Sequence, residues 1–243
     1  LEASSFEDAM RNAISIGGDS DTIGAIAGGV AEALFGIPDD IAAKGWSLLP
    51  QEMREVLTKL YALAGKTAQA DTPDTRISVV RGDIVQQTDC DAIVNSANQN
   101  LRAGSGVCGA IYTAAGPELE PFSTKLAPLA LGVAVATPGF NLASRLIIHT
   151  RGPKYLFDPE PAAHLAAAMR NTLLCADTNR VTKLAVPAIS MGVYAYPPEE
   201  AIPILVRTAR EMASELEHVQ EIRFVGMGAD LHLKFEQEIA RGT

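Results

Sequence analysis

Short apolar runs alternate with longer amphipathic stretches from residue 76 to the end of the chain. The runs predict strands at 77–81, 91–95, 133–136, 145–149, 183–187 and 221–225. Apolar residues that recur at helical spacing predict helices at 107–115, 118–126, 160–178, 198–216 and 230–241. This alternation predicts an α/β fold, in which helices cover both faces of a mostly parallel sheet of about six strands.

The first 64 residues show a different pattern, because every element they predict is helical. Ser4 and Glu7 have the spacing of a capping box at the start of a first helix. A second helix begins near the Gly-Gly-Asp-Ser-Asp-Thr sequence at 17–22, and a third begins at Pro50. Glycines inside the second helix predict that another backbone packs closely against it.

Residues 65–75 contain no large apolar side chain and predict a linker. The chain of 243 residues therefore divides into a helical segment at 1–64 and an α/β domain at 76–243. Hydrophobic residues make up 47% of the chain and aromatic residues only 5%, which excludes a disordered chain and predicts an aliphatic core.

The balance of charge limits the partners that we expect. The chain has 29 acidic and 20 basic residues and a formal net charge of −9, which argues against binding to duplex nucleic acid. No apolar stretch approaches the roughly 18 residues that span a membrane, so we expect no membrane partner. Three widely spaced cysteines match neither a disulfide framework nor a zinc site, which indicates a reducing, cytoplasmic location.

Two loops that follow predicted strands carry glycines and small side chains. In the first, Gly104, Gly106 and Gly109 have the spacing of a dinucleotide-binding motif, but they lie too far from the preceding strand for that function. A glycine-rich turn that opens a helix still presents backbone amides to an anion, although glycine could also serve tight packing alone. Together with the second loop, 188–197, it could hold a diphosphate at one edge of the sheet.

Residues 76–242 resemble a macrodomain, the module that binds ADP-ribose. The motifs that carry the resemblance are 82–84, 95–98, 104–109, 137–142, 147–153 and the loop at Ser190. The resemblance implies a three-layer α/β/α fold with a mixed sheet, no cofactor, and a monomer whose partner is ADP-ribose or an ADP-ribosylated protein.

The resemblance also assigns roles to single residues. Asp83 would accept a hydrogen bond from the adenine amino group, Asn98 would contact the distal ribose, and backbone amides of both loops would surround the diphosphate. The alternatives are that Asp83 only caps a turn and that Tyr194 is a core aromatic, and we interpret His149 as structural. The full set of implied ligand-binding residues is Asp83, Ile84, Ala97, Asn98, Gly104, Ser105, Gly106, Val107, Cys108, Ser190, Met191, Gly192, Val193, Tyr194 and Met227.

Two functions are consistent with these motifs. MacroD-type hydrolases carry an aspartate ten residues after the asparagine that corresponds to Asn98, and this chain has Cys108 there. The loop around Cys108 is similar to that of alphavirus macrodomains, which hydrolyse the same esters without the aspartate. We therefore expect hydrolysis of ADP-ribosyl esters on Asp or Glu, or of O-acetyl-ADP-ribose, by a positioned water, with Asn98 and Cys108 as candidate catalytic residues. The alternatives are a non-catalytic ADP-ribose reader and, for Cys108, a packing role.

The sequence Gly-Gly-Asp-Ser-Asp-Thr-Ile-Gly at 17–24 resembles the last metal-binding motif of the ADP-ribosylglycohydrolases, helical enzymes that use two magnesium ions. By this resemblance Asp19, Asp21 and Thr22 would be oxygen ligands. The other ligands of that family have no counterpart in the chain. We therefore expect a C-terminal remnant of such a domain that would need magnesium only together with its missing part. The alternative is that these residues only cap a helix.

Overall fold

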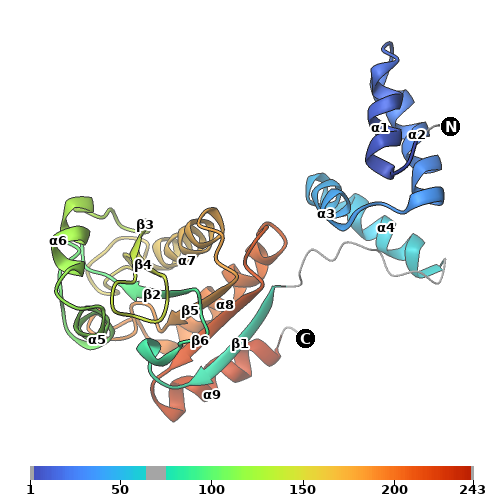
Figure 1. Ribbon diagram of the computed structural model, residues 1–243. Helices are drawn as coiled ribbons and strands as arrows, with labels where there is room; N and C mark the ends of the chain where they lie inside the picture. Colours follow the sequence, from blue (N-terminus) through green and yellow to red (C-terminus); the bar gives the residue numbers. More distant parts are fainter. Residues whose placement is uncertain (1–2, 64–74, 242–243) are drawn as a thin grey trace. The chain divides into compact units, whose positions relative to one another are not determined.

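The computed structural model describes residues 3–63 and 75–241 of the chain (Figure 1). The chain forms two compact units, Leu1–Thr72 and Pro73–Thr243. Among the helices of the described residues, none is long and apolar enough to cross a bilayer.

The second unit is built on a six-stranded mixed sheet. Its strands are β1 (Arg76–Arg81), β2 (Ala92–Ser96), β3 (Ala134–Pro138), β4 (Leu146–Thr150), β5 (Lys183–Pro187) and β6 (Glu221–Gly226). Their order is β1-β6-β5-β2-β4-β3, and every neighbouring pair is parallel except β3 and β4. The predicted sheet is confirmed, and each predicted strand lies within two residues of its observed ends.

Helices cover both faces of this sheet, which confirms the predicted three layers (Figure 1). One face carries α5 (Gly106–Ala115), α6 (Leu119–Ser123) and the 3₁₀ helices η1 (Ile84–Gln86) and η2 (Thr124–Leu126). The other face carries α7 (Pro161–Thr178), α8 (Pro198–Ala213) and α9 (Ala229–Ala240). The stretch 118–126, predicted as one helix, is divided into α6 and η2.

Each face of the sheet has its own apolar core. Leu165 and Met169 of α7 pack with Ile148 on one side, and Ile111 of α5 packs with Ile147 on the other. Ile147 and Ile148 are adjacent in β4 and point to opposite faces, because successive side chains of a strand alternate. The central strands therefore bury apolar side chains on both faces, which is the pattern that predicted them, although the buried polar residues Asn95 and His149 interrupt it.

The first unit is helical, as predicted, and consists of α1 (Phe6–Ser15), α2 (Ser20–Phe35), α3 (Asp39–Leu48) and α4 (Gln51–Leu63). The sequence pattern missed α3, and the predicted capping pair was wrong by one position. Ser5 Oγ accepts the backbone N–H of Asp8 at 3.2 Å, so that this pair caps α1 in place of Ser4 and Glu7.

Gly24 and Gly28 of α2 face the side chain of Met10 and not a backbone, and Gly29 faces open space, which corrects a second expectation. A Cβ atom at Gly28 would lie 3.5 Å from Met10 Sδ of α1. The two helices also leave an apolar groove of about 790 Å³, whose lining includes the exposed side chains of Ile16, Ile26 and Leu34. The unit thus exposes several large apolar side chains along one groove.

Leu165→Ala tests the core between α7 and the sheet. Leu165 is fully buried, so its truncation should lower the free energy of unfolding by about 2–5 kcal/mol, measured by urea denaturation. Leu174 lies on the same helix and is partly exposed, so that Leu174→Ala should cost no more than about 1 kcal/mol. Equal losses in the two variants would contradict this description of the core.

Candidate active site

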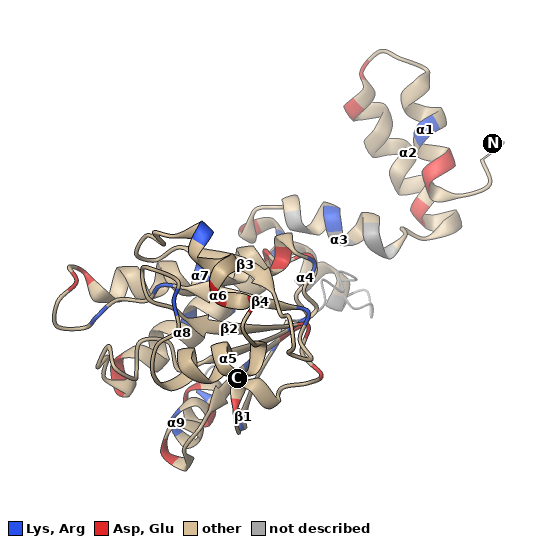
Figure 2. Ribbon diagram, turned by 60° about the vertical axis from the view of Figure 1, so that its left-hand side comes forward, with Lys and Arg blue, Asp and Glu red and all other residues tan. Residues whose placement is uncertain are grey.

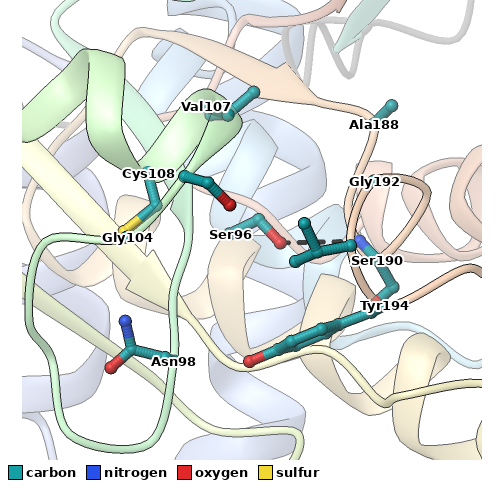
Figure 3. A pocket seen from close by; sticks show the side chains of 12 residues that line it. Ser96, Asn98, Gly104, Val107, Cys108, Ala188, Ser190, Gly192 and Tyr194 are labelled. Atoms are coloured by element: carbon teal, nitrogen blue, oxygen red, sulfur yellow. Dashed lines mark hydrogen bonds between the residues drawn. The ribbon is translucent and has the colours of Figure 1, made fainter.

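The loops that follow β2 and β5 form a cleft at one edge of the sheet. These two strands are parallel neighbours, so their carboxyl ends open side by side. The cleft has a volume of about 300 Å³ (Figure 3). Its lining residues are Ser96, Asn98, Gly104, Ser105, Gly106, Val107, Cys108, Ala188, Ser190, Gly192, Val193 and Tyr194.

The amino-terminal end of α5 forms one wall of the cleft. Gly106 has a φ of +59°, a conformation that favours glycine, and a Cβ atom at Gly109 would collide with the carbonyl oxygen of Gly104. Ser105 occupies the N-cap position without a side-chain cap. The first-turn amides of α5 have no acceptor within the helix, so this wall presents N–H donors and the positive end of the helix dipole.

A tight turn after β5 forms the opposite wall. Ser190 has a positive φ of 65°, and its carbonyl oxygen accepts the N–H of Tyr196 at 3.0 Å. Gly152, which follows β4, makes room for this turn, because a Cβ atom there would collide with Ser190 Oγ. Ser190 Oγ is buried and has no hydrogen-bond partner among the described residues. The turn leaves Gly192 and Val193 at the cleft surface.

Tyr194 and Asn98 lie at one end of the cleft, with the tyrosine hydroxyl directed toward the asparagine (Figure 3). Tyr194 is half-buried, and burial raises the pKa of its phenol. Lys154 Nζ lies 5.7 Å from the centre of the Tyr194 ring. Tyr194 therefore lines the cleft and is not a core aromatic.

The Asn98 side chain closes its own loop. Its Nδ2 donates to the carbonyl oxygen of Arg102 at 2.7 Å, and its Oδ1 accepts the N–H groups of Asn100 at 3.1 Å and Arg102 at 3.3 Å. These bonds fix the direction in which the amide faces the cleft. A side chain held in this way needs little reorganisation when it meets a ligand.

A chain of hydrogen bonds connects this loop to the interior of the sheet. The Cys108 thiol donates to the carbonyl oxygen of Arg102 at 3.5 Å, and Asn95 Nδ2 lies 3.7 Å from Cys108 Sγ. Asn95 Nδ2 also lies 3.0 Å from His149 Nδ1, and His149 Nε2 lies 3.0 Å from Thr137 Oγ1. The chain thus begins on β3 and ends beside Asn98.

The partners of His149 determine its protonation state. The amide nitrogen Nδ2 of Asn95 can only donate, so Nδ1 of His149 accepts, and the neutral tautomer with a proton on Nε2 fits both contacts. Burial lowers the pKa of His149 to about 4. Burial also raises the pKa of the Cys108 thiol, which therefore stays protonated at neutral pH. The geometry agrees with a structural histidine and a thiol that positions a loop.

Comparison with known proteins identifies the second unit. The family model described as Macro domain matches residues 94–205. A Macro domain-containing protein of Ralstonia nicotianae is 46% identical over 148 residues, which are 60% of this chain and 86% of that protein. The chain belongs to the macrodomain family. The model described as ADP-ribosylglycohydrolase matches residues 1–76, which include the helical unit.

Other macrodomains extend this relationship. The O-acetyl-ADP-ribose deacetylase of Salmonella newport is 40% identical over 156 residues, which cover 62% of this chain and 87% of that enzyme. A solved Oceanobacillus iheyensis macrodomain with MES bound is 33% identical, with a TM-score of 0.66, and the match covers 69% of this chain and 92% of that one. A structure of a variant of the same macrodomain with ADPR has the same TM-score and the same identity, and the match covers 69% of this chain and 94% of that one.

Five residues that the sequence assigned to the ligand lie outside the cleft lining described above. Asp83 caps η1 through Oδ1, which accepts the N–H of Val85 at 3.1 Å. The cap that the sequence offered as an alternative role for Asp83 is therefore formed. The Ile84 side chain is buried, while Met227 is exposed directly after β6. All three follow strands that end at the same edge of the macrodomain sheet as the cleft.

Ala97 and Met191 face the core of the macrodomain. Ala97 is buried, and Met191 packs against the core while its N–H donates to the carbonyl oxygen of Ala188 at 3.2 Å. Ser96 and Ala188 line the cleft, and although they belong to the motif 95–98 and the loop 188–197, they are not among the implied ligand-binding residues. Each is the last residue of a strand or the first residue after one, and this position is the signal that could have found them.

The three candidate magnesium ligands of the helical unit lie at the start of one helix. Asp19 is the N-cap residue of α2, and Asp21 and Thr22 lie in its first turn, with all three exposed. Within the described residues, no three His, Cys, Asp or Glu side chains gather closely enough to hold a metal ion. Magnesium dehydrates reluctantly, so this single exposed turn does not fit a resident ion.

The pH dependence of stability tests the state of His149. In the unfolded chain His149 takes up a proton as the pH falls below its usual pKa of 6.5. In the folded macrodomain its pKa is about 4, so it stays neutral until the pH falls to about 4. Stability is therefore lost as the pH falls through this window. Between pH 7 and pH 5, wild type should lose about 2 kcal/mol more than His149→Gln in urea denaturation. Equal losses in both proteins would contradict a buried neutral imidazole.

Proposed function

We propose that this macrodomain binds ADP-ribose in the cleft and hydrolyses ADP-ribosyl esters. The substrates would be proteins mono-ADP-ribosylated on Asp or Glu, or O-acetyl-ADP-ribose. The observation that carries the proposal is the cleft itself, in which two walls of backbone amides lead to the fixed side chain of Asn98. The ADPR in the related structure and the name of the Salmonella relative agree with this ligand and this reaction.

Backbone dipoles would bind the diphosphate. The first-turn amides of α5 and the turn at 190–194 face each other across the cleft, and neither wall needs a lysine or arginine to hold an anion. Acidic and basic residues are interspersed over the described part of the chain (Figure 2). The formal net charge of −9 therefore does not prevent an anionic ligand from binding.

The adenosine end of the ligand would extend toward β1 and β6. Asp83 uses Oδ1 for its cap, so Oδ2 would accept the adenine amino group, and the backbone N–H of Ile84 would donate to the ring. Met227 is exposed after β6, where its flexible thioether could cover the base. This assignment extends the ligand beyond the cleft walls along one edge of the sheet.

The ester would be cleaved by a water that the cleft holds beside the distal ribose. Attack of the water oxygen on the ester carbonyl carbon or on the anomeric carbon breaks one C–O bond and releases a carboxylic acid and ADP-ribose. Asn98 would orient the ribose hydroxyl groups, and the amide walls would stabilise the negative charge that develops. Positioning and electrostatics thus carry this reaction.

A non-catalytic reader is the second candidate, and a specific observation favours it. Among the described residues that line the cleft, none carries a carboxylate or an imidazole that could act as a general base. Cys108 cannot replace one, because burial raises its pKa. Release of ADP-ribose from a glutamate-linked substrate by the wild-type protein separates the two functions, since a reader would bind the substrate and release nothing.

Asn98→Ala tests the proposed reaction. The variant loses both the ribose contact and the bonds that close the loop, so kcat/KM for ester release should fall by about 100-fold. Asn100→Ala is the matched control, because Asn100 lies in the same loop with an exposed side chain, and its kcat/KM should change by less than about fivefold. Wild-type turnover that survives in Asn98→Ala would refute the role of Asn98.

Cys108→Ala tests the nucleophile hypothesis. A protonated thiol that only positions Arg102 is dispensable for chemistry, so turnover should stay within about tenfold of wild type, and the free energy of unfolding should fall by about 1 kcal/mol. Cys108→Ser keeps a donor for the Arg102 carbonyl and should be closer to wild type. Loss of all turnover with unchanged ADP-ribose affinity would instead identify Cys108 as a nucleophile.

A further inference from the structure

The three most exposed large apolar side chains described in the second unit lie in two neighbouring loops. Phe157 is 83% exposed, Val193 is 79% exposed and Leu156 is 75% exposed. Val193 belongs to the turn that lines the cleft, and the other two belong to the segment that follows β4. Scattered single apolar residues are normal on a surface, whereas a gathering of the most exposed ones at one place is not.

The segment that presents Leu156 and Phe157 is attached to the cleft wall. The N–H of Tyr155 donates to the carbonyl oxygen of Tyr194 at 3.0 Å, and Lys154 Nζ lies over the Tyr194 ring. The segment thus continues the wall of the cleft at its Tyr194 end. This is the end at which Asn98 lies (Figure 3).

Further bonds hold the segment in a defined conformation. The Tyr155 hydroxyl donates to Glu200 at 2.9 Å, and its ring packs against Tyr196 with a distance of 4.7 Å between ring centres. The Asp158 carboxylate accepts the N–H of Lys154 at 2.7 Å. The apolar pair is therefore displayed by an anchored turn, and polar residues flank it on both sides.

We propose that Leu156 and Phe157, together with Val193, contact apolar side chains of the protein that carries the ADP-ribose. We call these three residues the rim of the cleft. The inference rests on the proposed function, because a ligand whose distal ribose meets Asn98 would direct its attached group toward the rim. An acetyl group is too small to reach beyond the cleft, whereas the residues around a modified glutamate extend across it. The rim thus favours protein-linked substrates with apolar neighbours over free nucleotides.

Two synthetic peptides test this inference directly. Each carries ADP-ribose on one glutamate, which is flanked on both sides by leucine in one peptide and by serine in the other. The affinity of each is measured by competition against labelled ADP-ribose, a readout that applies to a hydrolase and to a reader. Wild type should bind the leucine-flanked peptide about tenfold more tightly than the serine-flanked one.

Variants separate the rim from the cleft. Leu156→Ser combined with Phe157→Ser should abolish the preference between the peptides and leave the affinity for free ADP-ribose unchanged, since neither residue lines the cleft. Phe157→Leu keeps an apolar side chain and should retain most of the preference. Leu174→Ser is the control, because it removes an exposed leucine on α7 that does not line the cleft. This variant should retain the whole preference between the peptides.

The outcomes distinguish this inference from the function on which it rests. Wild-type binding of ADP-ribose without a preference between the peptides overturns the inference alone. A preference that persists in the double serine variant also overturns it, because some other surface must then read the flanking residues. Wild-type protein that binds no ADP-ribose contradicts the proposed function and the inference together.

Discussion

Asn95 and His149 face each other across β2 and β4, and the 3.0 Å contact between their side chains connects the sheet to the cleft. Through Asn95 the contact continues to Cys108 and from there to the carbonyl oxygen of Arg102, which also accepts the Asn98 amide. All but the last of these side chains are buried, so each unmade bond would leave a costly unpaired polar group. These contacts therefore link the interior of the sheet to the loop that holds Asn98 in the cleft.

Among the described residues that line the cleft, none is charged, and its two walls present backbone amides, so an acidic chain can be suited to an anionic ligand. Gly106 and Gly109 allow the first wall to form, and Gly152 allows the turn at Ser190 to approach. These glycines lie in two different segments, α5 and the loop after β4, and they allow the two walls of the cleft to approach each other. The apolar rim at Leu156 and Phe157 continues the same wall with side chains suited to a protein surface.

The helical unit differs from the macrodomain in that its candidate ligand residues and several of its large apolar side chains are exposed. Its sequence resembles an ADP-ribosylglycohydrolase, and the matching family model agrees with that resemblance. Asp19 and Asp21 are nevertheless exposed on a single turn, and Ile16, Ile26 and Leu34 border an open apolar groove. In the described residues, the turn that carries the motif forms the start of α2.

The sequence by itself determined the six strands, the helices between them and the family, because periodicity and motif spacing are local properties. It missed α3 and placed the first cap one residue early. Only the tertiary structure decided that burial raises the pKa of the Cys108 thiol and lowers the pKa of His149, because both depend on packing by distant segments. It also decided that Leu156 and Phe157 are exposed. An apolar pair after a strand looks the same in sequence whether it enters the core or borders a cleft, and only the packing of the whole chain distinguishes the two.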